Sequence, residues 1–238
     1  MSKKELAKQE TGTEIAEVGM DAFGSGGLSS SDVIIPKIMT MQGLSKLVMD
    51  GEAKFGDFVD SMTNEVLGGP KEPLEFIPFA MKKIWVISKK NGNDFEYDRI
   101  EDVTPANEGR PWTEIVDGQE YKNDKVMNFY VLLTKDMSMP YVLPFKGTSM
   151  KAGRALATQM YMKNKAAGKH PAAKAMTLES VKNSNDKGTY AVLNTKVSRD
   201  SNADEVKECL RWYQAVAGGE VKEHDDSVST EQTTSSQF

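Results

Sequence analysis

Apolar and polar residues alternate, or form short apolar runs, through most of the middle of this chain, and this pattern predicts strands. Aromatic and β-branched side chains are frequent in these runs, as in half-buried strands. Pro78 lies inside the longest run, so we expect an irregularity or a sheet edge there, because proline cannot donate a ladder hydrogen bond. The predicted strands are 33–38, 54–60, 66–67, 74–90, 129–133, 141–145 and 188–197.

Two segments repeat their apolar residues at the spacing of a helix instead. The first is 149–166, whose apolar residues fall on one narrow stripe that can pack on a sheet. The second is 203–217, which follows Ser201 or Asn202 as N-cap and carries acids in its first turn. The stripe of the first helix consists of Ala152, Ala155, Leu156 and Met160.

The two ends of the chain show neither pattern. Residues 1–32 are polar and contain a Gly/Ser-rich run, so we expect a flexible N-terminal arm. Residues 218–238 are acidic and rich in Ser and Thr, which predicts a disordered tail. A single domain is therefore expected over 33–217. Its strands and two helices predict a predominantly β, α+β fold, in the specific form of an OB-like (oligonucleotide-binding) barrel with additions.

Composition excludes several classes of protein. Cys209 is the single cysteine, so no internal disulfide forms and a reducing compartment fits. No apolar run approaches the roughly 18 residues of a membrane-spanning helix. His170 and His224 with one cysteine cannot make the usual four-ligand zinc site, and neither histidine is sheltered enough for a general base. Phosphate-loop and dinucleotide motifs are missing. We therefore expect a protein that is not an enzyme and needs no cofactor or metal.

Charge is segregated along the chain. The whole sequence has 30 Lys+Arg and 35 Asp+Glu. Residues 135–199 carry 12 basic and 3 acidic side chains, whereas 94–124 carry 3 basic and 10 acidic ones. A stripe of one sign in a chain of the other is typical of a polyanion-binding surface. The segment 94–124 is also rich in turn residues, so we expect a long acidic loop or an excursion from the sheet.

The predicted helix at 149–166 places cations on the sides that its apolar stripe leaves free. Lys146, Lys151 and Arg154 are therefore candidates to bind phosphates, together with the free N–H groups of the first helical turn. An ordinary amphipathic helix with a lysine-rich exposed side would show the same pattern. The lack of any acid between 137 and 178 favours the phosphate-binding interpretation.

Flat rings beside cations would complete a single-strand site, because stacking on a base is worth roughly 1–3 kcal/mol and ignores base identity. Trp85 lies between lysines on one face of its predicted strand, and Tyr130 and Tyr190 have polar neighbours on theirs. Each ring could instead belong to the core. The candidate nucleic-acid-binding residues are Lys83, Trp85, Lys89, Tyr130, Lys146, Lys151, Arg154, Tyr190 and Lys196.

The acidic tail ends in an aromatic residue, Phe238. Such a segment could fold back into a cationic groove and compete with nucleic acid, or offer its ring and terminal carboxylate to a partner's pocket. Asp225, Asp226 and Phe238 are therefore candidate contacts for replication or transcription proteins. A frayed polar end without a role is the alternative.

A family likeness is carried by 33–38 (VIIPKI), 42–45 (QGLS), 51–58 (GEAKFGDF) and 65–68 (EVLG). These stretches resemble the opening of small bacteriophage proteins. The layout of barrel-like core, cationic middle and acidic tail ending in phenylalanine resembles phage single-stranded DNA-binding proteins. The likeness implies sequence-tolerant binding and protection of single-stranded DNA in phage replication or recombination, in the cytoplasm of the infected cell.

Two other functions stay open. One is a protein-interaction factor that engages a host or viral polymerase through 94–124 or through the tail. The other is a structural protein of the virion. The sequence leaves the oligomeric state open.

Overall fold

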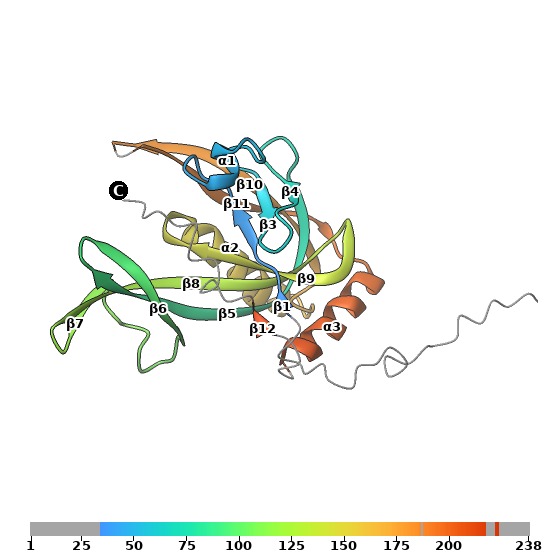
Figure 1. Ribbon diagram of the computed structural model, residues 1–238. Coiled ribbons are helices and arrows are strands. Elements are labelled where there is room, and N and C mark those ends of the chain that lie inside the picture. The colour runs from blue at the N-terminus through green and yellow to red at the C-terminus, as the bar shows by residue number, and fades with distance from the viewer. Residues whose placement is uncertain (1–33, 187, 218–221, 224–238) are drawn as a thin grey trace, which may run out of the picture.

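Two long antiparallel strands form the spine of the computed structural model, which describes residues 34–186, 188–217 and 222–223 (Figure 1). They are β5 (Leu74–Asn91) and β8 (Gln119–Leu133), which pair over most of their length. The register shifts between Pro78 and Ala80, which confirms the irregularity expected at this proline.

The seven-stranded sheet built on this spine has different neighbours at its two ends. At the core end, β9 (Asp136–Lys146) pairs with β8, β10 (Lys174–Asn185) pairs with β5, and β11 (Gly188–Asp200) pairs with β10. At the other end, β6 (Asp94–Asp102) pairs with β5 and β7 (Thr113–Val116) pairs with β8. We call this second end, residues 82–125, the arm. The acidic segment 94–124 is thus an excursion of the sheet that contains strands.

A small antiparallel sheet, β2 (Ile38–Thr40), β3 (Phe58–Asp60) and β4 (Val66–Gly68), covers part of the core. A parallel bridge from Lys37 to Val142 places it beside β9. On its other side, the amide of Gln42 accepts a hydrogen bond from Ala191 N at 2.9 Å and donates to Ala191 O at 3.3 Å. The short helix α1 (Lys46–Met49) follows β2.

The prediction of a predominantly β fold is confirmed, but the sheets do not close into a barrel. The β2–β3–β4 sheet meets β11 through the Gln42 side chain rather than through a strand ladder. The described residues thus give no support to the OB form of the prediction. A parallel pair, β1 (Ile34–Ile35) with β12 (Lys222–Glu223), completes the strands. Residues 222 and 223 belong to the segment predicted to be disordered, yet they form a strand.

Both predicted helices are present. The first begins with a 3-10 turn, η3 (Gly147–Ser149), continues as α2 (Met150–Thr158) and ends in a π-helical turn, η4 (Gln159–Asn164). Three members of its predicted apolar stripe are buried, namely Ala152, Leu156 and Met160. Ala155 is exposed instead.

The second helix, α3 (Ala203–Ala217), has the start that its sequence predicts. The side chain of Asn202 accepts a hydrogen bond from Glu205 N at 2.9 Å, and the Glu205 carboxylate accepts one from Asn202 N at 2.8 Å. This reciprocal capping box satisfies two N–H groups of the first turn. Of the two N-cap candidates, Asn202 is therefore the cap.

The core end of the sheet is buried on both faces. One face packs against α2 and the β2–β3–β4 sheet, with Phe76, Phe129 and Phe145 at its centre. The other face packs against α3 through Ile77 and Leu132. No helix in the described part of the chain is long and apolar enough to cross a membrane.

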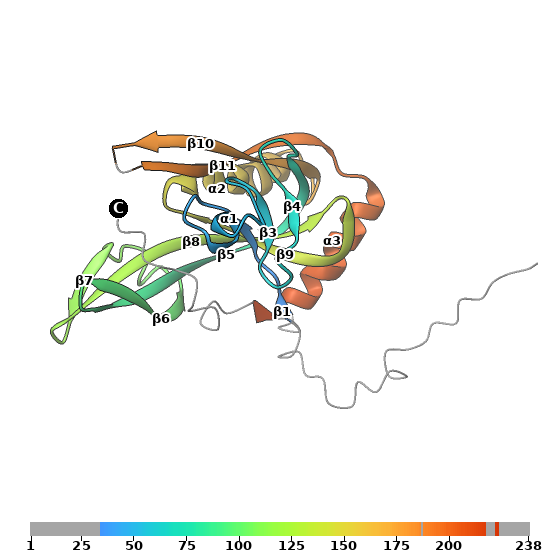
Figure 2. The same ribbon diagram turned by 45° about the horizontal axis from the view of Figure 1, so that its top comes forward.

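Figure 1 and Figure 2 show that the β10–β11 hairpin and the arm project to the same side of this core. In both views α2 lies between their bases, and α3 lies on the far side of the core.

Candidate nucleic-acid interface

Exposed cations follow the whole length of the first helix. We call Lys146, Lys151, Arg154, Lys163 and Lys165 the basic helix surface; all of them are exposed. Lys151 and Arg154 are three residues apart and therefore neighbours on one side of α2. Within the described residues, none of the cations of this surface forms an ion pair. No acid in this part of the chain therefore pairs with their charge.

Close packing against the sheet fixes which side of α2 faces outward. A Cβ on Gly153 would lie 2.8 Å from Cβ of Phe145, so only glycine lets α2 approach β9 this closely. Leu156 is fully buried on the same side. At the first turn, Ser149 Oγ accepts a hydrogen bond from Leu193 N on β11 at 3.1 Å. These contacts turn Lys151 and Arg154 to solvent.

The π-helical turn adds an aromatic side chain to this surface. Tyr161 is 39% exposed. It lies near the backbone of Met81, on a stretch of β5 between its pairing with β10 and its pairing with β6. Burial, and secondarily the nearby Tyr213 of α3, raises the pKa of Tyr161. Tyr213 itself is 46% exposed. Sequence reasoning missed both rings, although Tyr161 stands among the cations of the predicted helix.

Trp85 shares a strand face with Lys83 and Lys89, as predicted, but this face is covered. The connection 103–112 folds across it, so that Trp85 is only 4% exposed. Glu108 of this connection lies 3.6 Å from Lys83 Nζ and 3.5 Å from Lys125 Nζ. Lys125 Nζ in turn lies 5.2 Å from the centre of the Trp85 ring. The indole therefore has no free face for a base, while Lys89 remains exposed.

The two tyrosine candidates also lie away from the basic helix surface. Tyr130 is 7% exposed and packs beside Phe79, with ring centres 6.3 Å apart, in the core under α3. Tyr190 is half-buried on β11. By strand alternation, Tyr190 and Lys196 point to the face opposite Leu193, whose side chain belongs to the α2 core. Lys196 is paired with Glu179 at 2.8 Å.

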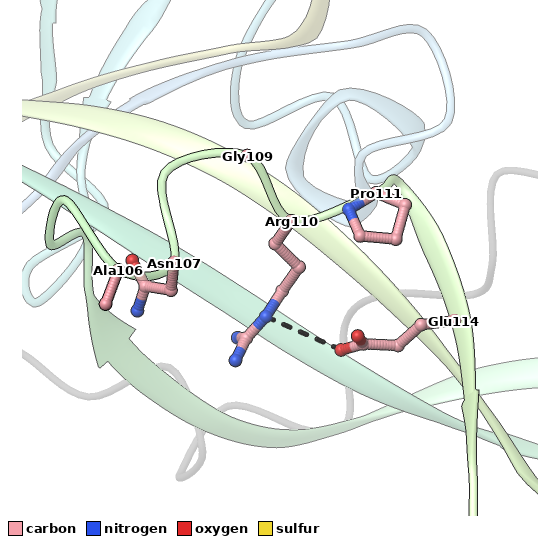
Figure 3. Close-up of a pocket in the computed structure, with 6 residues that line it drawn as sticks. All are labelled: Ala106, Asn107, Gly109, Arg110, Pro111 and Glu114. Atoms are coloured by element: carbon pink, nitrogen blue, oxygen red, sulfur yellow. Dashed lines mark ion pairs between the residues drawn. The ribbon is translucent and has the colours of Figure 1, made fainter.

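A shallow hollow on the arm contains an arginine that is already paired with acids of the arm. It is lined by Ala106, Asn107, Gly109, Arg110, Pro111 and Glu114 (Figure 3). The Arg110 guanidinium lies 2.8 Å from Glu101 and 3.5 Å from Glu114. An arginine held between two carboxylates has little charge left for a ligand, so this hollow is not a phosphate site.

The chain matches the family model of Pam3 phage gp34-like protein over residues 7–222. It belongs to the Pam3 phage gp34-like family. The phage part of the sequence-based resemblance is thereby confirmed. No curated protein and no solved structure matches the chain.

The matched region of this gp34-like protein contains both the basic helix surface and the arm. Of the predicted nucleic-acid-binding residues, Lys146, Lys151 and Arg154 are exposed on the segment that runs from the end of β9 into α2. Lys83 and Lys89 belong to β5 at the arm, and Tyr190 and Lys196 belong to the β10–β11 hairpin. Asp225, Asp226 and Phe238 lie outside the described residues. Across 34–186, 188–217 and 222–223, no three His, Cys, Asp or Glu side chains are grouped so that they could hold a metal ion.

Proposed function

We propose that this gp34-like protein binds single-stranded DNA through its basic helix surface, with little dependence on sequence, during phage replication or recombination in the infected cell. The supporting observation is that this surface combines exposed cations with no ion-pair partner in the part of the chain that the structure describes. A free cation that meets a phosphate displaces condensed counterions, and this release drives binding to nucleic acid. A cation already held by a carboxylate gains much less.

Tyr161 and Tyr213 supply the base contacts in this proposal, in place of the buried Trp85 and Tyr130. Tyr161 lies in the same helical segment as Lys163 and close to Lys165, so a phosphate and its base could be bound together. Stacking on such a ring is worth roughly 1–3 kcal/mol per base and tolerates any base. The proposed binding is therefore sequence-tolerant and strongly dependent on salt.

The test is a titration of a fluorescently labelled oligo-dT, followed by anisotropy over a series of salt concentrations. We compare the wild type with the triple variant Lys146→Ala, Lys151→Ala, Arg154→Ala. Single-strand binding has a salt slope of about 0.7 per phosphate contact, so the variant should lose about 2 from the slope and bind about tenfold or more weakly.

The matched control changes the same number of charges elsewhere. Lys46, Lys54 and Lys71 are exposed and belong to the α1 and β2–β4 region, and their replacement by alanine should leave the affinity close to that of the wild type. Equal losses in the two triple variants would mean that net charge, not this surface, governs binding. A wild type that does not bind oligo-dT even at low salt would end the proposal.

A further inference from the structure

The two faces of the arm differ in what covers them. Residues directly opposite each other in a ladder share a face, which assigns Trp85, Ile87 and Asn123 to one side. Their exposures of 4%, 0% and 1% show that this side is covered. The connection 103–112 lies over it, since Asn123 Nδ2 donates a hydrogen bond to Pro111 O at 2.9 Å, and we call it the covered face. The other side of the same four strands, which we call the open face, carries Val86, Ile100, Lys122 and Ile115.

The open face exposes several large apolar side chains. Ile100 is 38% exposed, Trp112 is 65% exposed and Ile115 is 75% exposed. The Trp112 ring stands over this face, because Lys122 Nζ lies 5.6 Å from its centre and its Nε1 donates to Asp124 at 3.3 Å. Apolar side chains gathered on one face mark a contact surface more often than scattered ones do, and tryptophan is enriched at the centre of protein interfaces.

The charges of the open face indicate what kind of partner it fits. Lys82 pairs with Asp102 at 2.9 Å, Lys90 with Glu120 at 2.6 Å and Lys122 with Asp124 at 3.0 Å. Every one of these lysines has an acid beside it, so the face offers no excess of either sign. It attracts neither a polyanion nor a strongly basic protein. A surface of alternating charges is complementary to itself when a two-fold axis turns one copy over the other, because each lysine can then meet an acid of the partner.

We infer that a second copy of this chain packs on the open face of the arm, in a two-fold symmetric dimer centred on Trp112 and Ile115. Their side chains become buried between the two arms, and the lysine–acid pairs form the rim. This dimer is independent of the proposed DNA binding, which uses α2, η4 and Tyr213 of α3.

The experiment measures the mass of the full-length chain by analytical ultracentrifugation, from low to high micromolar concentration. The wild type should form a dimer in this range, and Ile115→Glu should raise the dimer dissociation constant at least about tenfold, as expected for a central interface residue. The matched control is Val181→Glu on the β10–β11 hairpin, because Val181 is a strand residue with an exposure of 48%; this variant should remain dimeric. Ile115→Thr keeps a β-branched side chain and tests the same contact if the charged variant does not fold.

Three outcomes would overturn the inference. A wild type that stays monomeric at every concentration has no such interface. A dimer that survives both Ile115 variants forms through another surface. If the wild type is monomeric and removal of 218–238 speeds hydrogen exchange in 97–101 and 113–116, the chain's own tail covers the open face instead.

Discussion

The arm and the basic helix surface both contain many lysines and arginines, yet they use these side chains differently. On the arm, seven cations lie within ion-pair distance of an acid, namely Lys82, Lys83, Lys90, Arg99, Arg110, Lys122 and Lys125. On the helix, Lys151 and Arg154 have no such neighbour in the described chain. The cations of the basic helix surface are all exposed, whereas five of these seven arm cations are only partly exposed. A count of cations therefore does not describe the charge that a surface offers, because nearby acids and partial burial both reduce it.

The largest expected loss of stability comes from weakening the packing of α2 against the sheet. Leu156→Ala leaves a cavity at a fully buried position and should lower the free energy of unfolding by about 2–5 kcal/mol. Urea denaturation measures this loss, and the oligo-dT titration shows whether binding falls with it. Ala155 is exposed on the same helix, so Ala155→Ser is the control and should change the stability by less than about 0.5 kcal/mol. Equal stabilities of the two variants would contradict the packing described for α2.

The second largest expected effect is the loss of stability on removing an ion pair whose acid is better shielded from water than the acids of the arm. Glu205 has an exposed side-chain fraction of 10% and lies 2.7 Å from Arg199. Glu205→Gln keeps the shape but removes the charge, and should cost about 1.5–3 kcal/mol, the range for hydrogen bonds to charged groups. Thermal or urea unfolding followed by circular dichroism measures it. A loss no larger than that of an exposed arm pair would show that shielding from water does not strengthen this pair.

Acid should weaken the paired regions in a defined direction. The hydrogen bond from Arg199 lowers the pKa of Glu205, and the hydrogen bond from Arg99 lowers the pKa of Glu101 on the arm. Both groups have an ordinary pKa of 4.5, so their stabilisation is complete above this pH and is lost as the pH falls through the lower folded-state values. Urea midpoints measured from neutral pH downward should fall below about pH 4.5. If the urea midpoint of Glu205→Gln falls less steeply with pH than that of the wild type, Glu205 accounts for part of the acid effect. An unchanged slope of midpoint against pH would contradict the role given to Glu205.

The smallest expected change in stability belongs to a variant that directly tests the difference between paired and unpaired cations. Glu108→Gln removes the acid shared by Lys83 and Lys125, and because these pairs are exposed, the stability should change by only about 0.2–1 kcal/mol. The two released cations should give the arm a weak affinity for oligo-dT that is lost at moderate salt. The measurement uses the background Lys146→Ala, Lys151→Ala, Arg154→Ala, so that the arm alone is observed. No gain there would mean that free charge is not sufficient for binding.

The sequence predicts the local elements of this fold well and its long-range closure poorly. Helical spacing finds α2 and α3, and aromatic, β-branched runs find β5, β8, β9 and β11. The strands β6 and β7 are polar and largely exposed, so no apolar periodicity marks them. Their partners lie on β5 and β8, and only the folded ladder shows this. The Gln42 link between β2 and β11 joins residues 149 positions apart, which no local pattern reports.

The sequence predicts the exposed cations of the candidate site, but it does not predict which aromatic rings are exposed there. Lys151 and Arg154 follow from helix geometry, because the apolar stripe fixes which side faces the core. Strand alternation also predicts which face of the strand carries Trp85, but it does not predict that another segment covers this face. The connection 103–112 reaches across that face through Glu108 and Arg110, and a loop's path cannot be read from the residues it covers. Tyr161 gains its place from a π-helical turn, which shifts the helical register by a residue.

Cys209 makes α3 accessible to a simple chemical measurement. It is the single thiol of the chain, it is fully buried against the sheet, and burial raises its pKa to about 12. A thiol reagent can therefore modify the native protein only when α3 moves away from the sheet. The rate of labelling in the unaltered protein thus reports how often this helix detaches, without any added probe.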